Sequence, residues 1–475
     1  MVQIDRIEVD QLFGLYDHRI QLHPEERITL LHGPNGVGKT VMLRLLYGLL
    51  NGNFEMFYSV PFKEFRVYFV DKHSLRVQQD EGKRKAKGFS EIGSGIKIDI
   101  YLNNKKIESV DSDPLSEEAN MQASSILRHL APEIQHIDSE RWVLRNVGEV
   151  LTTKEAIRYA LGQAGALPAS LRQQLRRLIS SPLLDKLLGD SKAYLIGTNR
   201  LIPPLKMSRN RANIPSDFRE DQQESAVQHH ANVIRDVIAS TLAEYSRVSS
   251  QRDRTFPERL VHQREGKVNL SDSELRERFA HLEKRRNELE SAGLLDTQST
   301  GRPFAVPESL VETTRIVLSV YVEDTENKLA VFDDVEKRIA LLKQIVEKRF
   351  LHTKQFSIDR RKGFIFKSGE HELSPDQLSS GEQHELVLFC ELLFTVPTDS
   401  FILIDEPELS LHVAWQLEFL TDLQAVTRIR PMEILIATHS PWIVNDRWDL
   451  TAALSGDLER NASVPKTVSS RLGIT

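Results

Sequence analysis

Short alternations of hydrophobic and polar residues run through the first 110 residues of the chain. A period of two predicts β-strands, because neighbouring side chains of a strand point to opposite faces of a sheet. The predicted strands cover residues 2–9, 20–22, 28–31, 65–69 and 96–101. A helix interrupts them at 40–50, where Met42, Leu45 and Leu49 recur at helical spacing and form a core-facing stripe.

The middle of the chain has mainly helical periodicity. The predicted helices cover residues 113–188, 222–250 and 273–292. A short strand is predicted at 193–196, and the proline- and arginine-rich stretch 203–225 is typical of a connection. Leu275, Leu282 and Leu289 recur every seven residues. This favours a short antiparallel helical arm, although one partial heptad row is weak support for a coiled coil.

Strands and helices alternate in the last third of the chain. The predicted elements are a helix at 333–350, a hairpin at 354–367, a helix at 381–395, a strand at 401–404, a helix at 411–425 and a strand at 433–437. Alternation of this kind predicts a mostly parallel sheet with helices on both faces. The predicted fold class is therefore α/β, with an antiparallel β region at the N-terminus, a helical insertion and a short coiled-coil arm.

Length and composition narrow the classes of protein. A chain of 475 residues is too long for one compact core and predicts about two to four domains. The net charge of −6 means that the protein as a whole does not attract the negatively charged backbone of nucleic acid. Nucleic-acid binding therefore stays open but is not favoured. Cys390 is the single cysteine, which excludes a disulfide within the chain. Without an apolar leader or an apolar run of membrane length, the chain is predicted to be cytoplasmic, with no membrane partner.

A glycine-rich motif follows the predicted strand 28–31 and opens the predicted helix 40–50. Its residues are Gly33, Pro34, Asn35, Gly36, Val37, Gly38, Lys39 and Thr40. The strand–loop–helix context distinguishes a phosphate-binding loop from a chance match. Glycines let backbone N–H groups turn toward phosphate oxygens, and the helix N-terminus adds partial positive charge. Lys39 is expected to bind the β- and γ-phosphates and Thr40 to hold Mg²⁺, so the predicted cofactors are ATP and Mg²⁺.

Two carboxylates follow the apolar strand 401–404. Asp405 and Glu406 would emerge at the carboxyl edge of the sheet, where α/β folds bind their ligands. Asp405 suits the shell of Mg²⁺, and Glu406 suits positioning or deprotonating the attacking water. If this motif stood alone, an acidic strand end at a loop would be the simpler interpretation. His439 follows the strand 433–437 at the same edge, and with the other motifs in order a γ-phosphate contact is favoured over a structural role.

A second anion site is predicted at the start of the helix that precedes the strand 401–404. Ser379, Ser380, Gly381 and Glu382 place a serine hydroxyl and glycine N–H groups at the helix N-terminus. In isolation, the same residues are explained equally well as a serine N-cap followed by an early acidic residue. From the residues alone, both interpretations stay open.

The four motifs occur in the order found in the ABC ATPases, and the chain resembles that family over about residues 1–110, 190–205 and 350–450. The motif Asp-Glu-Pro-Glu-Leu-Ser-Leu-His at 405–412, with Ala-Thr-His-Ser-Pro at 437–441, is similar to the branch shared by OLD-family nucleases and antiphage ATPases, notably the ATPase subunits of PARIS-type defence systems. The resemblance implies an ABC-type P-loop ATPase head. Its expected parts are an N-terminal lobe at 1–112, a helical insertion at 113–190, a Q-loop strand at 191–202, a helical arm at 203–330 and a C-terminal lobe at 331–475.

The resemblance also implies a homodimer with composite ATP sites, and a higher homo-oligomer beyond it. Residues 410–412 would form the D-loop at the dimer seam, and Ser379 with Gly381 would contact ATP bound to the partner subunit. Asn199 stands where the family usually carries a Q-loop glutamine. Its shorter side chain can still offer an amide oxygen to Mg²⁺ or to the lytic water. The predicted enzyme is therefore an ATPase with slow, regulatory hydrolysis.

Two functions follow from the resemblance. The favoured one is a nucleotide-controlled sensor or scaffold in antiviral defence, which holds or activates a separate Toprim-type nuclease or toxin chain and responds to a phage-encoded trigger. Only 36 residues follow His439, too few for a nuclease domain, so the effector is expected on another chain. The alternative is an SMC-like DNA-handling or repair ATPase that uses the inserted arm. A transporter subunit is largely excluded, because 340 residues separate Lys39 from Ser379.

Overall fold

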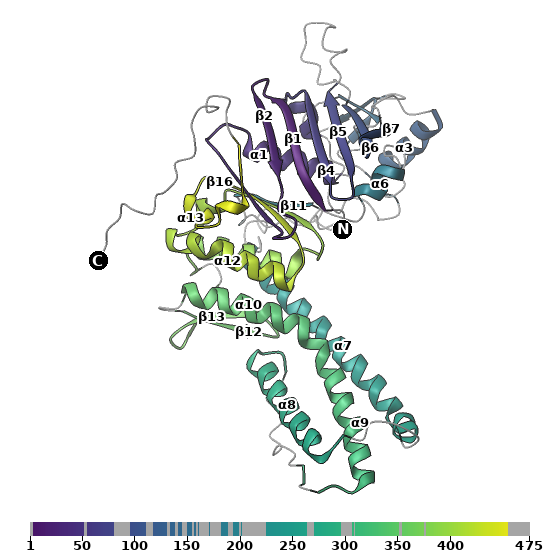
Figure 1. Ribbon diagram of the computed structural model, residues 1–475, viewed down its shortest axis with the longest axis vertical. Helices are drawn as coiled ribbons and strands as arrows, with labels where there is room; N and C mark the ends of the chain where they lie inside the picture. The colour runs from purple at the N-terminus through teal and green to yellow at the C-terminus, as the bar shows by residue number, and fades with distance from the viewer. Residues whose placement is uncertain are drawn as a thin grey trace, which may run out of the picture. The chain divides into compact units, whose positions relative to one another are not determined.

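The computed structural model (Figure 1) divides into two compact units. The first comprises Met1–Thr198, Thr398–Leu409 and Pro431–Thr475, and the second comprises Asn199–Pro397 and Ser410–Arg430. The structure describes residues 3–51, 55–79, 96–110, 117–130, 134–137, 141–144, 150–153, 182–188, 193–198, 225–263, 270–295, 306–307, 309–350, 354–374 and 377–454, together with 156, 157, 160, 171 and 201.

An antiparallel sheet of six strands forms one layer of the first unit, in the order β2-β1-β4-β5-β6-β7. The strands are β1 (Ile4–Leu12), β2 (Tyr16–Gln21), β4 (Glu64–Phe69), β5 (His73–Gln79), β6 (Ile96–Leu102) and β7 (Lys105–Val110). The alternation predicts four of them but not β5 and β7, in which polar residues hide the pattern. The turn between β6 and β7 has a hairpin signature, since Asn103 and Asn104 have φ of 49° and 62°.

A second sheet in this unit is wholly parallel, as the alternation of strands and helices predicts. Its order is β11-β15-β16-β3-β17. The strands are β3 (Ile28–His32), β11 (Ala193–Ile196), β15 (Phe401–Asp405), β16 (Glu433–Thr438) and β17 (Thr451–Ala453). Because every pairing is parallel, the carboxyl ends of β3, β15 and β16 meet at one edge. The motifs that follow these strands in the sequence are therefore brought together.

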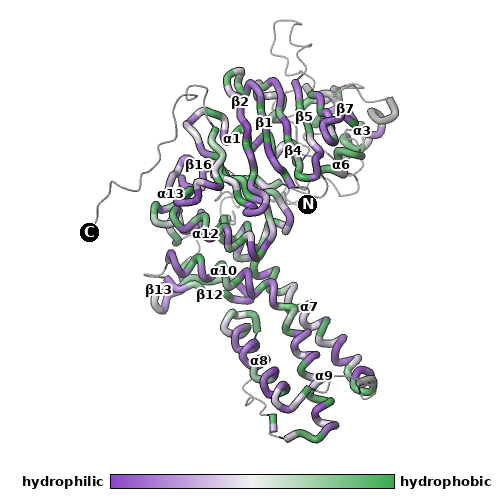
Figure 2. The backbone as a smooth tube through the Cα atoms, in the orientation of Figure 1, coloured by the Kyte–Doolittle hydropathy of each residue, from purple (hydrophilic) through white to green (hydrophobic). Residues whose placement is uncertain are grey.

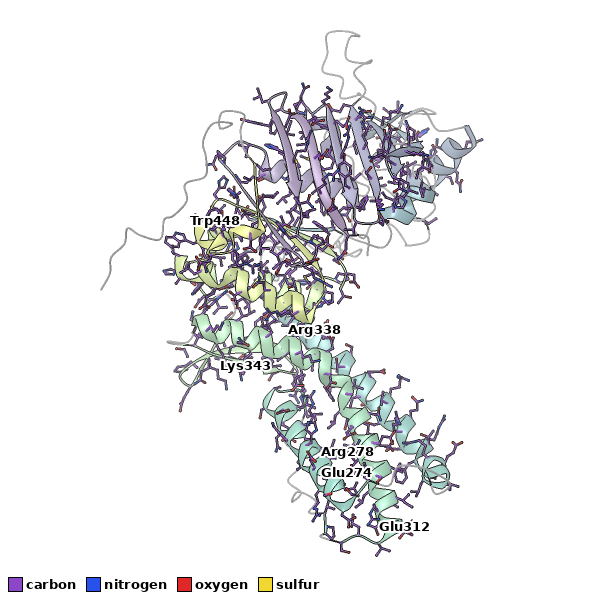
Figure 3. All side chains as sticks on the ribbon, viewed as in Figure 1. Glu274, Arg278, Glu312, Arg338, Lys343 and Trp448 are labelled. Atoms are coloured by element: carbon purple, nitrogen blue, oxygen red, sulfur yellow. The ribbon has the colours of Figure 1, made fainter. Side chains whose placement is uncertain are left out.

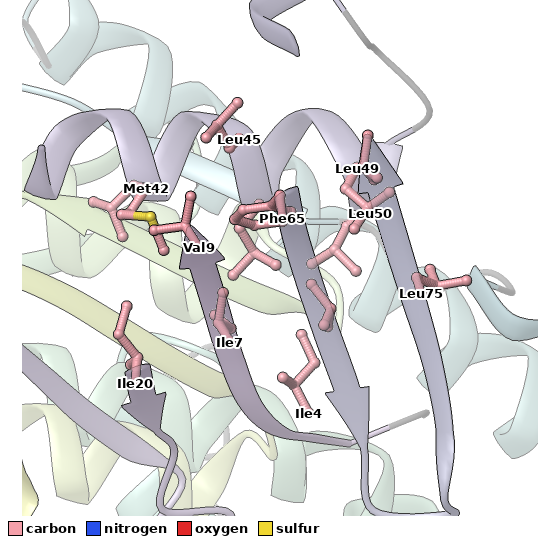
Figure 4. Packing of buried hydrophobic residues seen from close by; sticks show 14 of the residues in the cluster. Ile4, Ile7, Val9, Ile20, Met42, Leu45, Leu49, Leu50, Phe65 and Leu75 are labelled. Carbon is pink, nitrogen blue, oxygen red and sulfur yellow. The ribbon is translucent and has the colours of Figure 1, made fainter. Parts of the chain in front are cut away.

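Helix α1 (Lys39–Asn51) lies in the core of the first unit. Its residues Met42, Leu45 and Leu49 belong to one hydrophobic cluster with Val9 and Phe65 of the antiparallel sheet (Figure 4). The same hydrophobic cluster includes residues of β3, β15 and β16, so α1 is buried on more than one face. This burial fixes the start of α1 against both sheets, and the start of α1 carries Lys39 and Thr40. The fold of this unit is therefore of the predicted α/β class, with a parallel sheet and an antiparallel sheet.

Shorter elements complete the first unit. They are α2 (Glu55–Ser59), α3 (Glu117–Leu130), α6 (Pro182–Leu188), α13 (Pro441–Val444) and the 3₁₀ turns η7 (Pro407–Ser410) and η8 (Trp448–Leu450). The stretch 113–190 is predicted as helical, and this is wrong for β8 (Ile134–His136), β9 (Arg141–Leu144) and β10 (Val150–Thr152), which form a small antiparallel sheet. Strands of three or four residues are too short to show a period of two. The buried ring of Trp142 anchors them, and its Nε1 donates to Thr153 Oγ1 at 3.2 Å.

Glu433 starts β16 with its side chain buried in the first unit. Burial raises the pKa of its carboxyl to about 7, against the weaker opposing effects of the Ile4 backbone N–H and of Arg27. A pKa that is higher in the folded state than in the unfolded state means that the folded state holds a proton which the unfolded state releases. This stability is fully present below the unfolded value of 4.5 and is lost as the pH rises through about 7.

Replacing Glu433 with glutamine is therefore expected to flatten the stability profile of the protein between pH 4.5 and 7. The loss of folding free energy in the wild type is at most about 3.5 kcal/mol, since one pKa unit corresponds to about 1.4 kcal/mol. Thermal unfolding at several pH values measures it, with the exposed Glu370→Gln as control. A variant with the same pH slope as the wild type would contradict this assignment.

Three helices form the arm of the second unit: α7 (Ala226–Gln263), α8 (Asp272–Ser291) and α9 (Glu312–Leu329). Figure 2 shows that α8 is largely hydrophilic. The predicted heptad row of α8 is buried nonetheless, with Leu275, Leu282 and Leu289 all nearly inaccessible. The capping box between Ser271 and Glu274 fixes where α8 begins.

Ion pairs define the directions of the arm helices. Arg259 of α7 pairs with Asp324 of α9, and Lys328 of α9 pairs with Asp253 at 2.7 Å. From the first pair to the second, the residue number falls in α7 and rises in α9, so the two helices run antiparallel. Three pairs join α8 to the α9–α10 segment: Asp272–Arg315, Arg278–Glu326 and Arg285–Asp333. These numbers rise together, so α8 runs parallel to α9 (Arg278 is labelled in Figure 3). Because α8 follows the direction of α9, it also runs antiparallel to α7, and the predicted antiparallel arm therefore includes the helix with the heptad row.

The rest of the second unit begins with the turn η4 (Ala330–Phe332) and helix α10 (Asp333–Phe350). A three-stranded sheet, β12 (Gln355–Asp359), β13 (Gly363–Ser368) and β14 (His371–Leu373), follows, and then α11 (Ser380–Cys390), a π-helical turn η6 (Glu391–Thr395) and α12 (Val413–Ile429). Arg349 of α10 lies buried between Glu385 of α11 and Asp422 of α12 and forms ion pairs with both. Within the described part of the chain, none of the helices combines the length and apolar composition needed to cross a bilayer.

Candidate functional site

The glycine-rich loop lies between β3 and α1, as the motif predicts. Gly36 and Gly38 have φ of 84° and 97°, a conformation that side chains with a Cβ rarely adopt. A Cβ on Gly38 would come within 2.5 Å of the Leu12 side chain, whereas no described atom lies within 4 Å of one on Gly36. Gly38 therefore allows close packing against β1. His18 supports the loop, since its buried Nε2 lies 2.8 Å from the Val37 carbonyl oxygen.

Lys39 is the first residue of α1, and its side chain folds back along the loop. The ammonium Nζ donates to the carbonyl oxygens of Gly33 at 2.8 Å and Pro34 at 2.9 Å. It also lies 3.2 Å from Nδ1 of His439, which follows β16 at the same sheet edge. Burial lowers the pKa of Lys39, and the nearby carboxylates oppose that shift. The predicted phosphate ligand and the predicted γ-phosphate sensor are therefore in contact across 400 residues of sequence.

Thr40 and Asp405 meet at the centre of the site. The Thr40 hydroxyl donates to Asp405 Oδ1 at 3.0 Å, which joins the start of α1 to the end of β15. Burial raises the pKa of Asp405, the hydrogen bond from Thr40 opposes this, and the charge of Glu406 adds to it. A hydroxyl and a carboxylate at this distance can share the shell of one hard cation with oxygen ligands. The pair thus fits the predicted Mg²⁺ site.

Glu406 has an unusual backbone conformation for a glutamate, with φ of 43°. Its N–H donates to the Ala437 carbonyl oxygen at 2.8 Å, which holds the residue at the sheet edge. Its Oε1 lies 3.6 Å from Nε2 of His439. The predicted water-positioning carboxylate and the predicted γ-phosphate sensor therefore face each other.

Glu408 is a site residue that the sequence reasoning missed. Its Oε1 accepts a hydrogen bond from the backbone N–H of His439 at 2.5 Å, so it fixes the position of that histidine. The second glutamate of Asp-Glu-Pro-Glu was the available signal. The ring of Trp448 lies edge-on to His32, the last residue of β3, with ring centroids 5.7 Å apart. Burial and, to a smaller extent, Lys39 lower the pKa of His32.

The other predicted residues are not among the contacts of this cluster that the structure describes. Ser379, Ser380, Gly381 and Glu382 belong to the second unit, where they open α11. Ser379 is the N-cap of that helix and forms a capping box with Glu382. The structure therefore shows the serine N-cap that was one of the two interpretations of these residues. Asn199 lies outside the described residues. Asn35 belongs to the loop, with its side chain exposed.

A protein-family model described as "AAA domain, putative AbiEii toxin, Type IV TA system" matches residues 28–445. The chain belongs to this family. It is accordingly a P-loop ATPase, and the ATP-binding motifs described above lie inside the matched range.

Two solved structures of Smc head domains also resemble the chain. One is a Pyrococcus furiosus Smc head with an extended coiled coil, bound to the C-terminal domain of ScpA; it is 13% identical, the match covers 94% of this chain and 91% of that one, and the TM-score is 0.31. The other is an Smc head bound to the C-winged helix domain of ScpA, with 10% identity, coverage of 93% and 90%, and a TM-score of 0.31. No curated protein matches the chain.

Proposed function

We propose that the chain is a nucleotide-controlled scaffold of a prokaryotic antiviral defence system. ATP would close two copies around composite sites, and the closed form would hold or activate a separate Toprim-type nuclease chain. The contact of Lys39 with His439 is the observation that carries the nucleotide part of this proposal, because it joins the phosphate loop to the edge where hydrolysis is expected. Hydrolysis is then a slow regulatory step.

Each residue of the cluster has a role in this proposal. The loop N–H groups and Lys39 would hold the β- and γ-phosphates, and Thr40 with Asp405 would hold Mg²⁺. A bound metal would supply positive charge that neutralises the phosphates. Glu406 orients the attacking water, and His439 contacts the γ-phosphate. Glu408 keeps His439 in place through its backbone N–H.

Two considerations support a defence role. The description of the family names a putative AbiEii toxin and a type IV TA system. The motifs at 405–412 and 437–441 resemble those of the AriA ATPase subunit of the PARIS defence system, which implies a separate nuclease effector and a phage-encoded trigger. We propose that a homodimer, and a higher oligomer built from it, presents the effector. The expected location is the cytoplasm.

The SMC-like alternative draws its support from the arm of α7, α8 and α9, which could reach along DNA. The charges of that arm favour the scaffold instead. Arg259 and Arg278 form ion pairs with carboxylates of α9, and Arg285 pairs with Asp333 and Glu336 of α10. Arginines engaged in this way are less available to phosphates of a duplex. Binding of duplex DNA that weakens steeply with salt would favour the alternative.

A mixing experiment tests the composite site. Ser379→Arg is expected to abolish hydrolysis and to leave ATP binding by single copies intact, because the arginine blocks only the surface that faces the partner's ATP. An equal mixture of Ser379→Arg and Lys39→Ala should regain about a quarter of wild-type activity, because about half of the dimers are mixed and each has one intact site.

The exposed Ser240→Arg on α7 serves as the matched control and should behave as the wild type. Mixtures that stay inactive despite proven subunit exchange would contradict the composite site. The effector part is tested by co-purification with the product of the neighbouring gene, with and without ATP. Failure to co-purify in any nucleotide state would contradict it.

A further inference from the structure

Lys354 stands directly before β12 and reaches the start of α11. Its Nζ donates to Glu382 Oε2 at 2.6 Å. The same carboxylate oxygen accepts from the backbone N–H of Ser379 at 2.7 Å and from its hydroxyl at 2.9 Å. The pair is sheltered, since the side chains of Lys354 and Glu382 are 18% and 13% exposed. One lysine thus holds one carboxylate in the first turn of the helix.

Glu382 remains charged in this position. Burial tends to raise the pKa of its carboxyl, but the hydrogen bonds from Lys354 and Ser379 outweigh burial and keep the pKa below its usual value. A carboxylate in the first turn suits the helix, because the positive end of the helix dipole attracts it. It does not suit a surface that receives phosphate, because two negative groups repel each other at close range.

The place of Lys354 is set by the fold of the second unit. It lies between the end of α10 and the start of the β12–β13 hairpin, and β12 packs against α10. At the far end of that hairpin, Gly363 has φ of 84°, and a Cβ there would collide with the backbone of Ala231 in α7. The hairpin is therefore seated closely on α7 and holds Lys354 against α11. Lys354 is a poor candidate for a freely moving surface lysine.

We infer that Lys354 is a positioning residue of the composite ATP site: its ammonium cancels the charge of Glu382 and holds that carboxylate against Ser379, so that the start of α11 can accept the phosphates of ATP bound to a second copy of the chain. This inference rests on the proposed composite site. The ligand class is a nucleoside triphosphate held by the partner. Lys354 acts through Glu382 and does not itself touch the nucleotide.

The test compares Lys354→Met, Glu382→Gln and the double variant in the full chain. Lys354→Met is expected to lower the ATP hydrolysis rate and the ATP-dependent self-association by about tenfold, because an uncancelled carboxylate then faces the partner's phosphates. ATP binding by single copies should change by less than about twofold, because the phosphate loop is untouched. Lys354→Arg, which keeps the charge, should behave as the wild type.

The decisive measurement is rescue. Glu382→Gln removes the charge that Lys354 cancels, so the double variant should return to within about threefold of wild-type hydrolysis. Lys362→Met is the matched control, because Lys362 lies on the same hairpin and forms an exposed ion pair with Glu372 at 2.5 Å. This control should leave hydrolysis unchanged. Thermal unfolding of every variant separates a loss of activity from a loss of fold.

Three outcomes would overturn the inference. Equal hydrolysis by Lys354→Met and Lys362→Met would show that the charge of Glu382 does not matter. The double variant could stay as impaired as Lys354→Met, which would indicate that Lys354 contacts the partner's ATP directly or only supports the fold. Normal hydrolysis by Ser379→Arg would instead refute the composite site itself, and this result is independent of Lys354.

Discussion

Replacing Lys39 with alanine is expected to weaken ATP binding by about 100-fold or more and to abolish every ATP-dependent activity. The ammonium of Lys39 is the positive side chain inside the phosphate loop, and it lies beside His439 at the edge of the sheet. Alanine removes both the charge and the donor. Isothermal titration calorimetry with ATP measures the affinity, and hydrolysis is followed by phosphate release.

The control for this variant is Lys63→Ala, which removes an exposed lysine from the same unit. Lys39 also donates to the carbonyl oxygens of Gly33 and Pro34, so the variant could lose stability as well as affinity. Circular dichroism and thermal unfolding distinguish the two effects. Unchanged ATP affinity in a folded variant would remove Lys39 from its assigned role.

Much of the first unit could be predicted because its chemistry follows local sequence. The phosphate loop needs a strand, glycines and a helix in one stretch, and β3, the loop and α1 supply them. The parallel sheet then follows from the alternation of strands and helices, and it brings Asp405 and His439 to the edge beside Lys39. The pairing of Thr40 with Asp405 was implied by the motif order.

Other features depend on contacts between distant residues and could not be predicted. Glu408 matters because of its hydrogen bond to the backbone of His439, which is 31 residues away. The parallel course of α8 depends on ion pairs such as Arg278–Glu326, which join residues 48 positions apart. Lys354 has no motif of its own, and only the packing of its hairpin places it at Glu382. Periodicity reports which face of a helix is buried but says nothing of its partner.

Residues 379–382 at the start of α11 could not be assigned from the sequence for a different reason. Ser379 and Glu382 form a capping box, and the same residues could serve as an anion site in a closed dimer. Both interpretations use the free N–H groups of a helix N-terminus. The mixing experiment with Ser379→Arg and Lys39→Ala distinguishes the two interpretations. The ion pair of Lys354 with Glu382 offers a second way to separate them, since helix capping alone does not require the charge of Glu382 to be cancelled.

Replacing Glu406 with glutamine is expected to lower hydrolysis by about 100-fold or more while Mg-ATP still binds. The amide keeps the size of the side chain and its reach toward His439, but it can neither accept a proton from water nor carry the negative charge that orients it. Lys39, Thr40 and Asp405 are unchanged. The variant should therefore accumulate in its ATP-bound form.

That trapped form separates a switch from a motor. A ligand shifts a two-state equilibrium only by its differential affinity for the two states. If ATP contacts both copies only in the closed dimer, Glu406→Gln should strengthen ATP-dependent self-association by about tenfold in sedimentation experiments. The exposed Glu25→Gln is the control and should associate as the wild type does.

A scaffold that needs only the closed state would keep its effector in the Glu406→Gln variant, and could act without its trigger. A machine that needs repeated cycles of hydrolysis would be as inactive as Lys39→Ala. Co-purification of the effector with each variant, in the presence of ATP, compares the two. We expect Glu406→Gln to retain the effector and Lys39→Ala to lose it, because only the former can close around ATP. Equal retention of the effector by both variants would contradict the switch model, because ATP binding would then not control the effector.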